Sequence, residues 1–337
     1  MKKHTLRNVL ALLVLAGLAA ACAAPVATEA PAGTTVRVAL ILPGRADDVS
    51  WNQASFQGMN NAVERAQADG ITVELTMVEQ VYDPVDIEPA LRDYAQQGYD
   101  LIVGHGFQFQ EPIIKVAAEF PEVNFAIGTG FKLAPNVGVY DVRLEQGGYL
   151  MGLIAGTLSQ TGIVGVIGGV DVSEIHRGHV AFGKGAEEVN QEVQVLNSFV
   201  GDFNDLPAAR EAAMSQIDAG ADVIWQSGDG IGLAILGACG ERGVLCMGNV
   251  ANQNAIAPEN VLASFVYDWG PVYAQMIGQT AEGGFGNTFY WIEFANGGVS
   301  IIYNDALQSR ITPELQTRLD EAQQGFIDGT LDLGDLD

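Results

Sequence analysis

The run Gly162-Ile-Val-Gly-Val-Ile-Gly-Gly-Val170 repeats, halfway along the chain, a pattern that Val36 to Pro43 begins near its start. Both runs are short and apolar, and a segment with helical periodicity follows each of them. Short apolar runs that alternate with helical segments are typical of parallel strands that helices cover on both faces. Because the alternation starts twice, we expect an α/β fold of two doubly wound parallel-sheet lobes joined by a hinge.

Two such lobes in tandem bring the carboxyl ends of both sets of strands to a single cleft. Ligands of open α/β sheets bind at these strand ends. Two lobes on a hinge can also close around a ligand. The loops that follow the predicted strands are therefore the places to look for binding residues.

The first 35 residues are predicted to direct export rather than to fold. Three basic residues precede Val9 to Leu18, an apolar run without charge, and Ala19 to Ala21 then lead to Cys22. The run is too short for a membrane span, which takes about 20 residues, but is typical of a secretory signal. The small residues before Cys22 resemble a bacterial lipobox. We predict a signal peptide over 1–21 and a lipidated Cys22 with a flexible tether over 22–35. An ordinary cleaved signal that happens to precede a cysteine is the alternative.

Composition excludes several classes of protein. Hydrophobic residues make up 48% of the 337-residue chain and charged residues 17%, which is typical of a globular protein. The formal net charge of −25 argues against a nucleic-acid partner, because phosphate binding needs a basic face. Cys239 and Cys246 could form a disulfide in an exported protein or could be two small buried residues, and the sequence leaves both possibilities open.

Aromatic residues occur in two of the loops after predicted strands. The first loop, Pro43 to Gln53, holds Trp51, which either covers its own core or stacks on a ligand. The loop after the third strand holds Phe107 and Phe109, which suggest a flat ligand with polar edges, although one of them could simply fill the adjacent core. Stacking on a planar ring contributes about 1–3 kcal/mol per base.

A third loop follows the strand that ends near Gln226. Its Gly228-Asp-Gly-Ile-Gly232 is not a dinucleotide fingerprint, because the third glycine comes one place early and no acidic residue follows at the expected distance. We therefore expect no nucleotide cofactor. A helix N-terminus with Asp229 remains, suited to ligand hydroxyls or ring nitrogens.

The sequence shows no catalytic or metal-binding constellation. His176 and His179 share a helical face, but a zinc site needs a third ligand, so we expect both histidines to be solvated at a helix start. No Gly-x-Ser-x-Gly elbow and no cysteine–histidine pair is recognisable. We therefore expect a protein that is not an enzyme and needs no cofactor or metal.

Several motifs in order are similar to those of one known family: Asp48-Val-Ser-Trp-Asn52, Leu91-Arg-Asp-Tyr-Ala-Gln-Gln-Gly98, Glu145-Gln-Gly-Gly-Tyr-Leu-Met-Gly152 and Gly168-Gly-Val-Asp171. Together they resemble the basic membrane protein family of ABC-transporter substrate-binding lipoproteins, over residues 36–329. The resemblance implies the type I periplasmic-binding fold. We predict a first lobe of residues 36–138 plus 251–288 and a second lobe of residues 139–250 plus 289–330.

Known members of that family bind purine nucleosides or purine bases, so the resemblance implies a purine-type ligand. Matching motifs assign the base side to Asp48, Trp51, Asn52 and Phe107. Val250 occupies the place of the usual ribose-binding Asp and Tyr267 that of the usual Lys, so both ribose anchors are missing unless Asn249 and Asp268 substitute. A subgroup with a similar Asp268-Trp-Gly-Pro271 is associated with bare purine bases. A site without hydroxyl-binding groups should lose selectivity for ribose.

The leading hypothesis is a receptor, lipid-anchored to the bacterial envelope membrane through Cys22, that captures a purine base or nucleoside and delivers it to an ABC permease. Trp51, Phe107 and Phe109 would contact the ring. The predicted polar residues of the site are Asp48, Asn52, Gln226, Asp229, Asn249, Tyr267 and Asp268. A sugar or signalling molecule as ligand is the first alternative. An exported nucleoside hydrolase would need a dense acidic cluster for calcium, and only Asp47 and Asp48 lie together. A surface adhesin is the last alternative.

Overall fold

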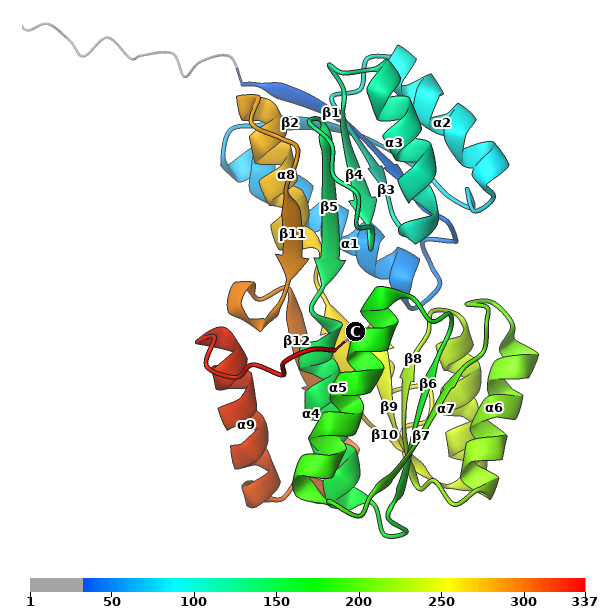
Figure 1. Cartoon of the computed structure of the whole chain (residues 1–337). Coiled ribbons are helices and arrows are strands. Elements are labelled where there is room, and N and C mark those ends of the chain that lie inside the picture. Colours follow the sequence, from blue (N-terminus) through cyan, green and yellow to red (C-terminus); the bar gives the residue numbers. More distant parts are fainter. Residues whose placement is uncertain (1–32, 337) are drawn as a thin grey trace, which may run out of the picture. The chain divides into compact units, whose positions relative to one another are not determined.

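The computed structural model describes residues 33–336 of the chain (Figure 1). The predicted signal peptide, Cys22 and the tether up to residue 32 lie outside the described residues. Within the described part, the two predicted sheets are present, each with six strands. No helix in this part of the chain combines the length and the apolar character that a membrane span requires.

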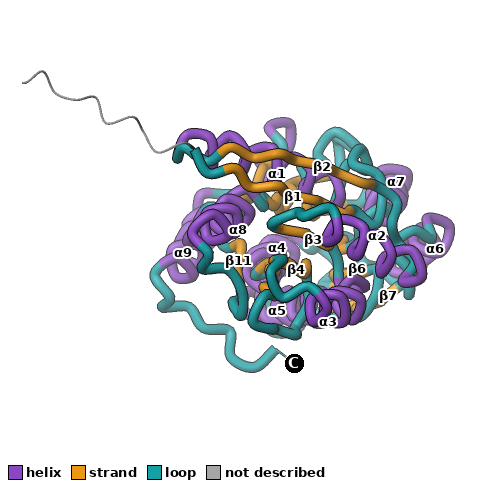
Figure 2. The backbone as a smooth tube through the Cα atoms, turned by 90° about the horizontal axis from the view of Figure 1, so that it is seen from above, coloured by secondary structure: helices purple, strands orange, loops and turns teal. Residues whose placement is uncertain are grey.

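The first sheet is parallel throughout and has the strand order β11-β5-β4-β3-β1-β2. Figures 1 and 2 both show β1 and β2 side by side at its edge. Its strands are β1 (Thr35–Ile41), β2 (Thr72–Val78), β3 (Leu101–Gly104), β4 (Asn124–Gly128), β5 (Val137–Val142) and β11 (Phe289–Ile292). The helices that cover it are α1 (Trp51–Ala68), α2 (Pro84–Gln96), α3 (Gln110–Glu119) and α8 (Gly270–Glu282).

The second sheet has the order β12-β10-β9-β8-β6-β7 and is parallel except for the antiparallel pair of β10 and β12. Its strands are β6 (Ile163–Gly168), β7 (Gln194–Phe199), β8 (Val223–Ser227), β9 (Leu245–Val250), β10 (Val261–Tyr267) and β12 (Val299–Tyr303). Its helices are α4 (Leu144–Leu158), α5 (Ser173–Val189), α6 (Leu206–Asp218), α7 (Ile231–Arg242) and α9 (Pro313–Ile327). Residues 33–336 also contain short 3₁₀ helices at Phe107–Phe109, Phe294–Asn296 and Asp305–Arg310.

The strands owe their apolar runs to burial on both faces. Along β1, Val38 and Leu40 belong to a core shared with α1 and α8, whereas Ala39 and Ile41 face a second core formed with α2 and α3. Successive side chains of a strand point to opposite faces, so a strand between two helical layers must be apolar at every position. The predicted α/β class is therefore confirmed, and each sheet with its helices is called a lobe below.

The chain crosses between the lobes at places other than those predicted. Strand β5 pairs with β4, so residues 139–142 belong to the first lobe. Strand β10 pairs with β9 of the second sheet, although 251–288 was assigned to the first lobe. Strand β11 pairs with β5 of the first sheet, although 289–330 was assigned to the second. An apolar run shows that a strand forms, but not which sheet it joins, because both sheets bury their strands alike.

Cys239 and Cys246 are both buried and free. They belong to the core between the second sheet and helices α6 and α7. The structure thus shows the second of the two possibilities, in which both residues act as small apolar groups.

Candidate ligand-binding cleft

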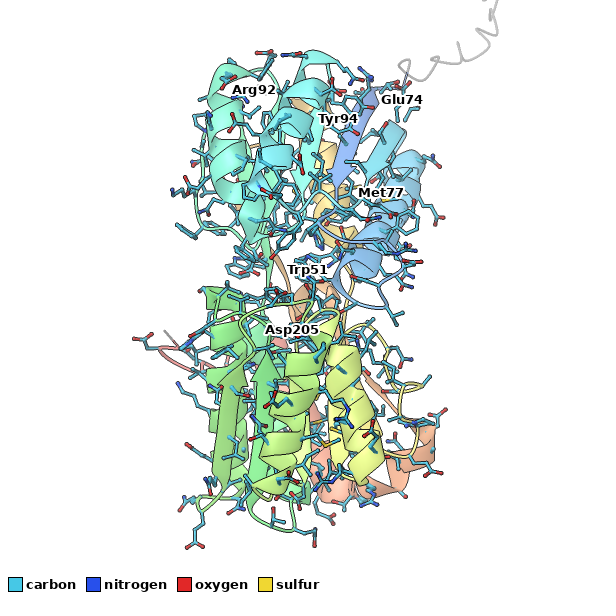
Figure 3. All side chains as sticks on the ribbon, turned by 90° about the vertical axis from the view of Figure 1, so that its right-hand side faces the viewer. Trp51, Glu74, Met77, Arg92, Tyr94 and Asp205 are labelled. Atoms are coloured by element: carbon cyan, nitrogen blue, oxygen red, sulfur yellow. The ribbon has the colours of Figure 1, made fainter. Side chains whose placement is uncertain are left out.

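A cavity of about 340 Å³ is lined by residues of both lobes, within the range of small-molecule sites. The first lobe supplies the loops after β1, β2, β3 and β4, and the second lobe those after β6, β7, β8 and β9. All of these strands are parallel, so the cavity lies at the carboxyl ends of the strands in both sheets. Figure 3 shows Trp51 at the end of the first lobe that adjoins the second.

Trp51 lines this cavity and also covers an aromatic core. Its indole stacks on the imidazole of His105 with ring centroids 4.3 Å apart, and its Nε1–H donates to the His105 carbonyl at 3.3 Å. The ring of Trp269 meets Trp51 edge-on at 5.4 Å. Only 7% of Trp51 is exposed. Trp51 is therefore a rigid wall of the cavity, held in place by the core behind it.

His105 is neutral in this core. Its Nε2–H donates to the Trp51 carbonyl at 3.2 Å, so its Nδ1 accepts from the Tyr140 hydroxyl at 2.8 Å. Burial lowers the pKa of His105 to about 3. The imidazole thus supports the Trp51 ring without carrying a charge.

The predicted polar pair Asp48 and Asn52 lines the cavity, but its polar atoms are already used. The Asp48 carboxylate accepts the backbone N–H groups of Ser50, Asn52 and Gln53 and the Asn52 side-chain amide, at 2.7 to 3.0 Å. The Asn52 Oδ1 accepts the Gly44 N–H at 3.0 Å. These bonds satisfy the N-terminus of α1 and fix the loop that carries Trp51.

Phe107 lines the cavity and is 38% exposed, so it is available for contact with a ligand. Phe109 does not line the cavity, so its prediction as a ligand-binding residue was wrong. Phe109 is fully buried in the core beside α2 and α3. The 3₁₀ turn Phe107–Phe109 turns one ring inward and leaves the other outward.

Three further predicted residues do not line the cavity. Gln226 is fully buried, donates to the Gln253 Oε1 at 2.7 Å and accepts the Gly228 N–H at 2.9 Å. Tyr267 lies behind Asn249, whose Nδ2 donates to its hydroxyl at 3.1 Å. Asp268 accepts the N–H of Gly270 at the start of α8. Their polar groups make hydrogen bonds within the protein.

The second lobe contributes the uncommitted polar groups of the cavity. Asn249 is 1% exposed, and its Oδ1 is buried without a hydrogen-bond partner. Within residues 33–336, the carboxyl groups of Glu174 and Asp229 also lack hydrogen-bond partners. A buried polar atom without a partner costs about 1–3 kcal/mol, so the Asn249 Oδ1 marks a place for a ligand, and the two carboxyl groups line the same cavity.

Burial changes the ionisation of both carboxyl groups. Burial, with a smaller contribution from the nearby Asp48, raises the pKa of Asp229 to about 8. It raises the pKa of Glu174 well above the usual range, with Asp141 adding to the effect and Arg177 opposing it. Perturbed acids that converge on one cavity are typical of a functional site.

Ser227 and Glu174 were missed as site residues by the sequence analysis. Ser227 is the last residue of β8 and Glu174 follows β6 by six positions, and this nearness to a strand's carboxyl end was the available signal. We expected the helix in this region to start at the histidine pair. Helix α5 begins at Ser173 instead, so Glu174 lies in its first turn and lines the cavity.

The histidine pair differs from expectation at one position. His176 lies at the surface beside Asp171, as predicted. His179, which was predicted to be solvated, is 3% exposed. Its Nδ1 contacts the Asn197 Oδ1 at 2.7 Å and its Nε2 contacts the Ser227 Oγ at 2.5 Å. The reason is that α5 packs this face against β7 and β8. Within the described residues, no group of His, Cys, Asp and Glu side chains is arranged to hold a metal ion.

The backbone is strained around the cavity. Gln80, Thr129 and Val250 line it with φ angles of 63°, 52° and 72°. Positive φ is unfavourable for residues with a side chain, and most of all for β-branched ones. Such strain tends to concentrate at binding sites, which agrees with the partnerless polar atoms nearby.

The family model and the similar proteins include ABC transporter substrate-binding proteins. A family model described as ABC transporter substrate-binding protein PnrA-like (Bmp) matches residues 35–328. A purine-binding protein of Brucella abortus is 32% identical over 76% of this chain and 72% of its own. A putative ABC transporter glucose-binding protein of Haloferax volcanii is 29% identical over 89% and 74%. The solved ABC transporter solute-binding protein of Conexibacter woesei has a TM-score of 0.71 and 29% identity, covering 89% of this chain and 99% of that one.

Proposed function

Since the chain belongs to the Bmp family of PnrA-like ABC transporter substrate-binding proteins, we propose that its cleft captures a purine-type ligand for delivery to a permease. Substrate-binding proteins of this kind bind small molecules and are not enzymes, in agreement with the absence of a catalytic motif from the sequence. We also propose that the protein is lipid-anchored through Cys22 and lies outside the cytoplasm.

One observation carries the purine assignment. The cavity places aromatic surface from Trp51 and Phe107 in the first lobe together with partnerless polar atoms from the second lobe. A purine is flat, with hydrogen-bonding groups on its edge, and so matches a site that combines both features. The purine-binding relative from Brucella abortus supports the same class of ligand.

The site favours a bare base over a nucleoside. At the expected ribose position, Val250 presents an apolar side chain to the cavity, and Tyr267 lies behind Asn249 instead of reaching the cavity. A ribose placed there would lose the hydrogen bonds that its hydroxyl groups make in water. A ribose thus finds no obvious anchor at these two positions.

Phe107 gives the cleanest test, because it is exposed and its loss leaves the core intact. We expect Phe107→Ala to weaken the binding of adenine or guanine by about tenfold or more, measured by calorimetric titration of the ligand-free protein, since stacking contributes about 1–3 kcal/mol per base. Phe131→Ala is the matched control, because Phe131 is 72% exposed and does not line the cavity. Equal affinities for both variants and the unmodified protein would remove Phe107 from the site.

A sugar is the second candidate, and the glucose-binding relative from Haloferax volcanii favours it. Sugars also stack on aromatic rings, so the aromatic wall alone does not distinguish the two ligand classes. Titration with adenine, guanine, adenosine, ribose and glucose does. Binding of glucose with no response to any purine would overturn the purine assignment.

A further inference from the structure

The second-lobe wall of the cavity holds a hydrogen-bond relay that ends at the ligand position. His179 stands between the Asn197 Oδ1 at 2.7 Å and the Ser227 Oγ at 2.5 Å. Ser227 is 1% exposed and lines the cavity, whereas His179 lies behind it, stacked on Phe199 with centroids 4.7 Å apart. The family assignment and the motifs described above leave this relay without a role.

The direction of the relay follows from the chemistry of its members. The Asn197 Oδ1 can only accept, so His179 carries its proton on Nδ1. Burial lowers the pKa of His179 to about 4, so the ring is neutral near pH 7 and its Nε2 has no proton. The Nε2 must therefore accept the hydroxyl proton of Ser227. Consequently, the Ser227 oxygen meets the cavity as an acceptor.

Asn249 presents a second acceptor to the same cavity. Its Nδ2 is held by the Tyr267 hydroxyl at 3.1 Å, and its backbone N–H is held by the Gln253 Oε1 at 3.2 Å. The first bond fixes the side-chain amide and the second fixes the backbone, and the amide atom that remains is the buried, partnerless Oδ1. The carboxyl groups of Glu174 and Asp229 lie on the same wall, but burial raises the pKa of both, which favours protonated acids that can donate as well as accept, so the preference is set by Ser227 and Asn249.

We propose that this wall selects the ligand by its N–H donors: Ser227 and Asn249 are specificity-determining acceptors, His179 is the positioning residue that keeps Ser227 an acceptor, and the preferred ligand is a purine with an exocyclic amino group. The inference rests on the proposed purine-binding function. At the position of the amino group, an oxo group would bring a lone pair against the Ser227 and Asn249 oxygens and leave the Asn249 Oδ1 partnerless. Sites built to pair with a substrate N–H reject analogues that lack it by large factors.

The test compares adenine with hypoxanthine and guanine with xanthine, pairs in which an oxo group replaces the amino group and the adjacent ring nitrogen gains a proton. We expect the amino member of at least one pair to bind the ligand-free protein about 100-fold more tightly, measured by calorimetric titration near pH 7. In that pair, Ser227→Ala and Asn249→Leu should each reduce the preference about tenfold or more. His179→Asn should reduce the same ratio, because Ser227 would then be free to donate, whereas a merely structural loss would weaken both members alike.

Phe107→Ala is the control for the ratio, since stacking does not distinguish an amino from an oxo group. This variant should weaken both members of a pair equally. Purines that bind with no preference, or with a preference for the oxo member, would overturn this inference and leave the purine-binding proposal standing. A protein that binds no purine at all would overturn the proposed function and the inference with it.

Discussion

Asp229 shows at the level of a single residue how a binding site can cost stability. The group is an ordinary acid in the unfolded chain, but burial raises its pKa to about 8 in the folded protein. An acid whose folded pKa is raised stabilises the fold only while it is protonated. That contribution is complete below the unfolded value near 4 and is lost as the pH rises through about 8.

We expect Asp229→Asn to become progressively more stable than the unmodified protein between pH 4 and pH 8, without ligand. Asparagine does not titrate, so the difference in unfolding free energy should grow by at most about 1.4 kcal/mol per pH unit. Urea denaturation at several pH values measures it. The titratable groups that interact electrostatically with Asp229 are Asp48, Glu174, Tyr82 and Tyr267. All are acids or phenols, so none of them supplies a compensating positive charge.

Asp47→Asn is the control for this prediction, because Asp47 is exposed and paired with Arg45, which lowers its pKa. The contribution of Asp47 to stability is constant between pH 4 and pH 8. The difference in unfolding free energy between Asp47→Asn and the unmodified protein should therefore not change over this range. A flat curve for Asp229→Asn as well would show that Asp229 is not buried as an acid in the empty cleft.

Residue types near strand ends predicted part of the site, but their hydrogen bonds were not predictable. Asp48 and Asn52 were expected at the cavity and do line it. Their use in holding the α1 N-terminus could not be seen, because an Asp before a helix is equally typical of a cap and of a ligand contact. The only signal for Ser227 was its position at the end of a strand, since its role depends on a histidine 48 positions earlier in the chain.

At the level of elements, helices α4 and α5 make the closest contact in the described part of the molecule. An added Cβ at Gly185 of α5 would lie 2.1 Å from the Tyr149 carbonyl oxygen of α4. At Gly152 of α4 it would lie 2.1 Å from the Phe182 carbonyl oxygen of α5. The two backbones thus touch through glycines, and a side chain at either position must force the helices apart.

We expect Gly185→Ala to lower the unfolding free energy by about 1–3 kcal/mol, because overpacking a tight interface costs that much. Gly183→Ala is the matched control in the same helix, since a Cβ there meets nothing within 4 Å. Alanine is the better helix former by about 0.5–1 kcal/mol, so this control should be neutral or slightly stabilising. Equal effects of the two substitutions would contradict the close contact of α4 and α5.

The elements themselves were largely predictable, because apolar runs and helical periods are local properties of the sequence. The apolar runs at 36–42 and 163–167 correspond to β1 and β6. The start of α5 was expected at the histidine pair, whereas the helix begins at Ser173. In the structure, Gly178 faces the Leu144 side chain of α4, so it marks helix packing rather than a helix end.

At the level of the whole molecule, the lobe exchange of β10 and β11 was the main feature that the sequence concealed. The chain passes between the lobes after β5, after β10 and between β11 and β12. These passages bring Asp141 at the end of β5 close to Arg177 of α5, with their charged atoms 3.0 Å apart. Neither position is informative alone, since the pair is made by residues of different lobes.

The pair of Asp141 and Arg177 is largely buried, with side-chain exposures of 7% and 16%. Burial raises the pKa of Asp141 to about 6, and Arg177 counteracts that rise, so the carboxyl group is ionised near pH 7. Arg177 also lies 3.4 Å from the Glu145 carboxylate. Arg177 thus balances the Asp141 carboxylate and shares Glu145 with Arg143, whose guanidinium lies 3.4 Å from the other Glu145 oxygen, where the chain passes between the lobes.

We therefore expect Arg177→Met to lower the unfolding free energy by about 3–5 kcal/mol at pH 7, because it leaves a buried carboxylate without its partner. The double variant Asp141→Asn, Arg177→Met should recover a substantial part of that loss, since it removes the uncompensated charge as well. Arg210→Met is the control, because the pair of Arg210 and Glu241 is exposed and should contribute less than about 1 kcal/mol. A double variant no more stable than Arg177→Met would show that Arg177 acts through packing, for instance over the ring of Trp291, and that charge compensation between the lobes is not what holds this part of the fold.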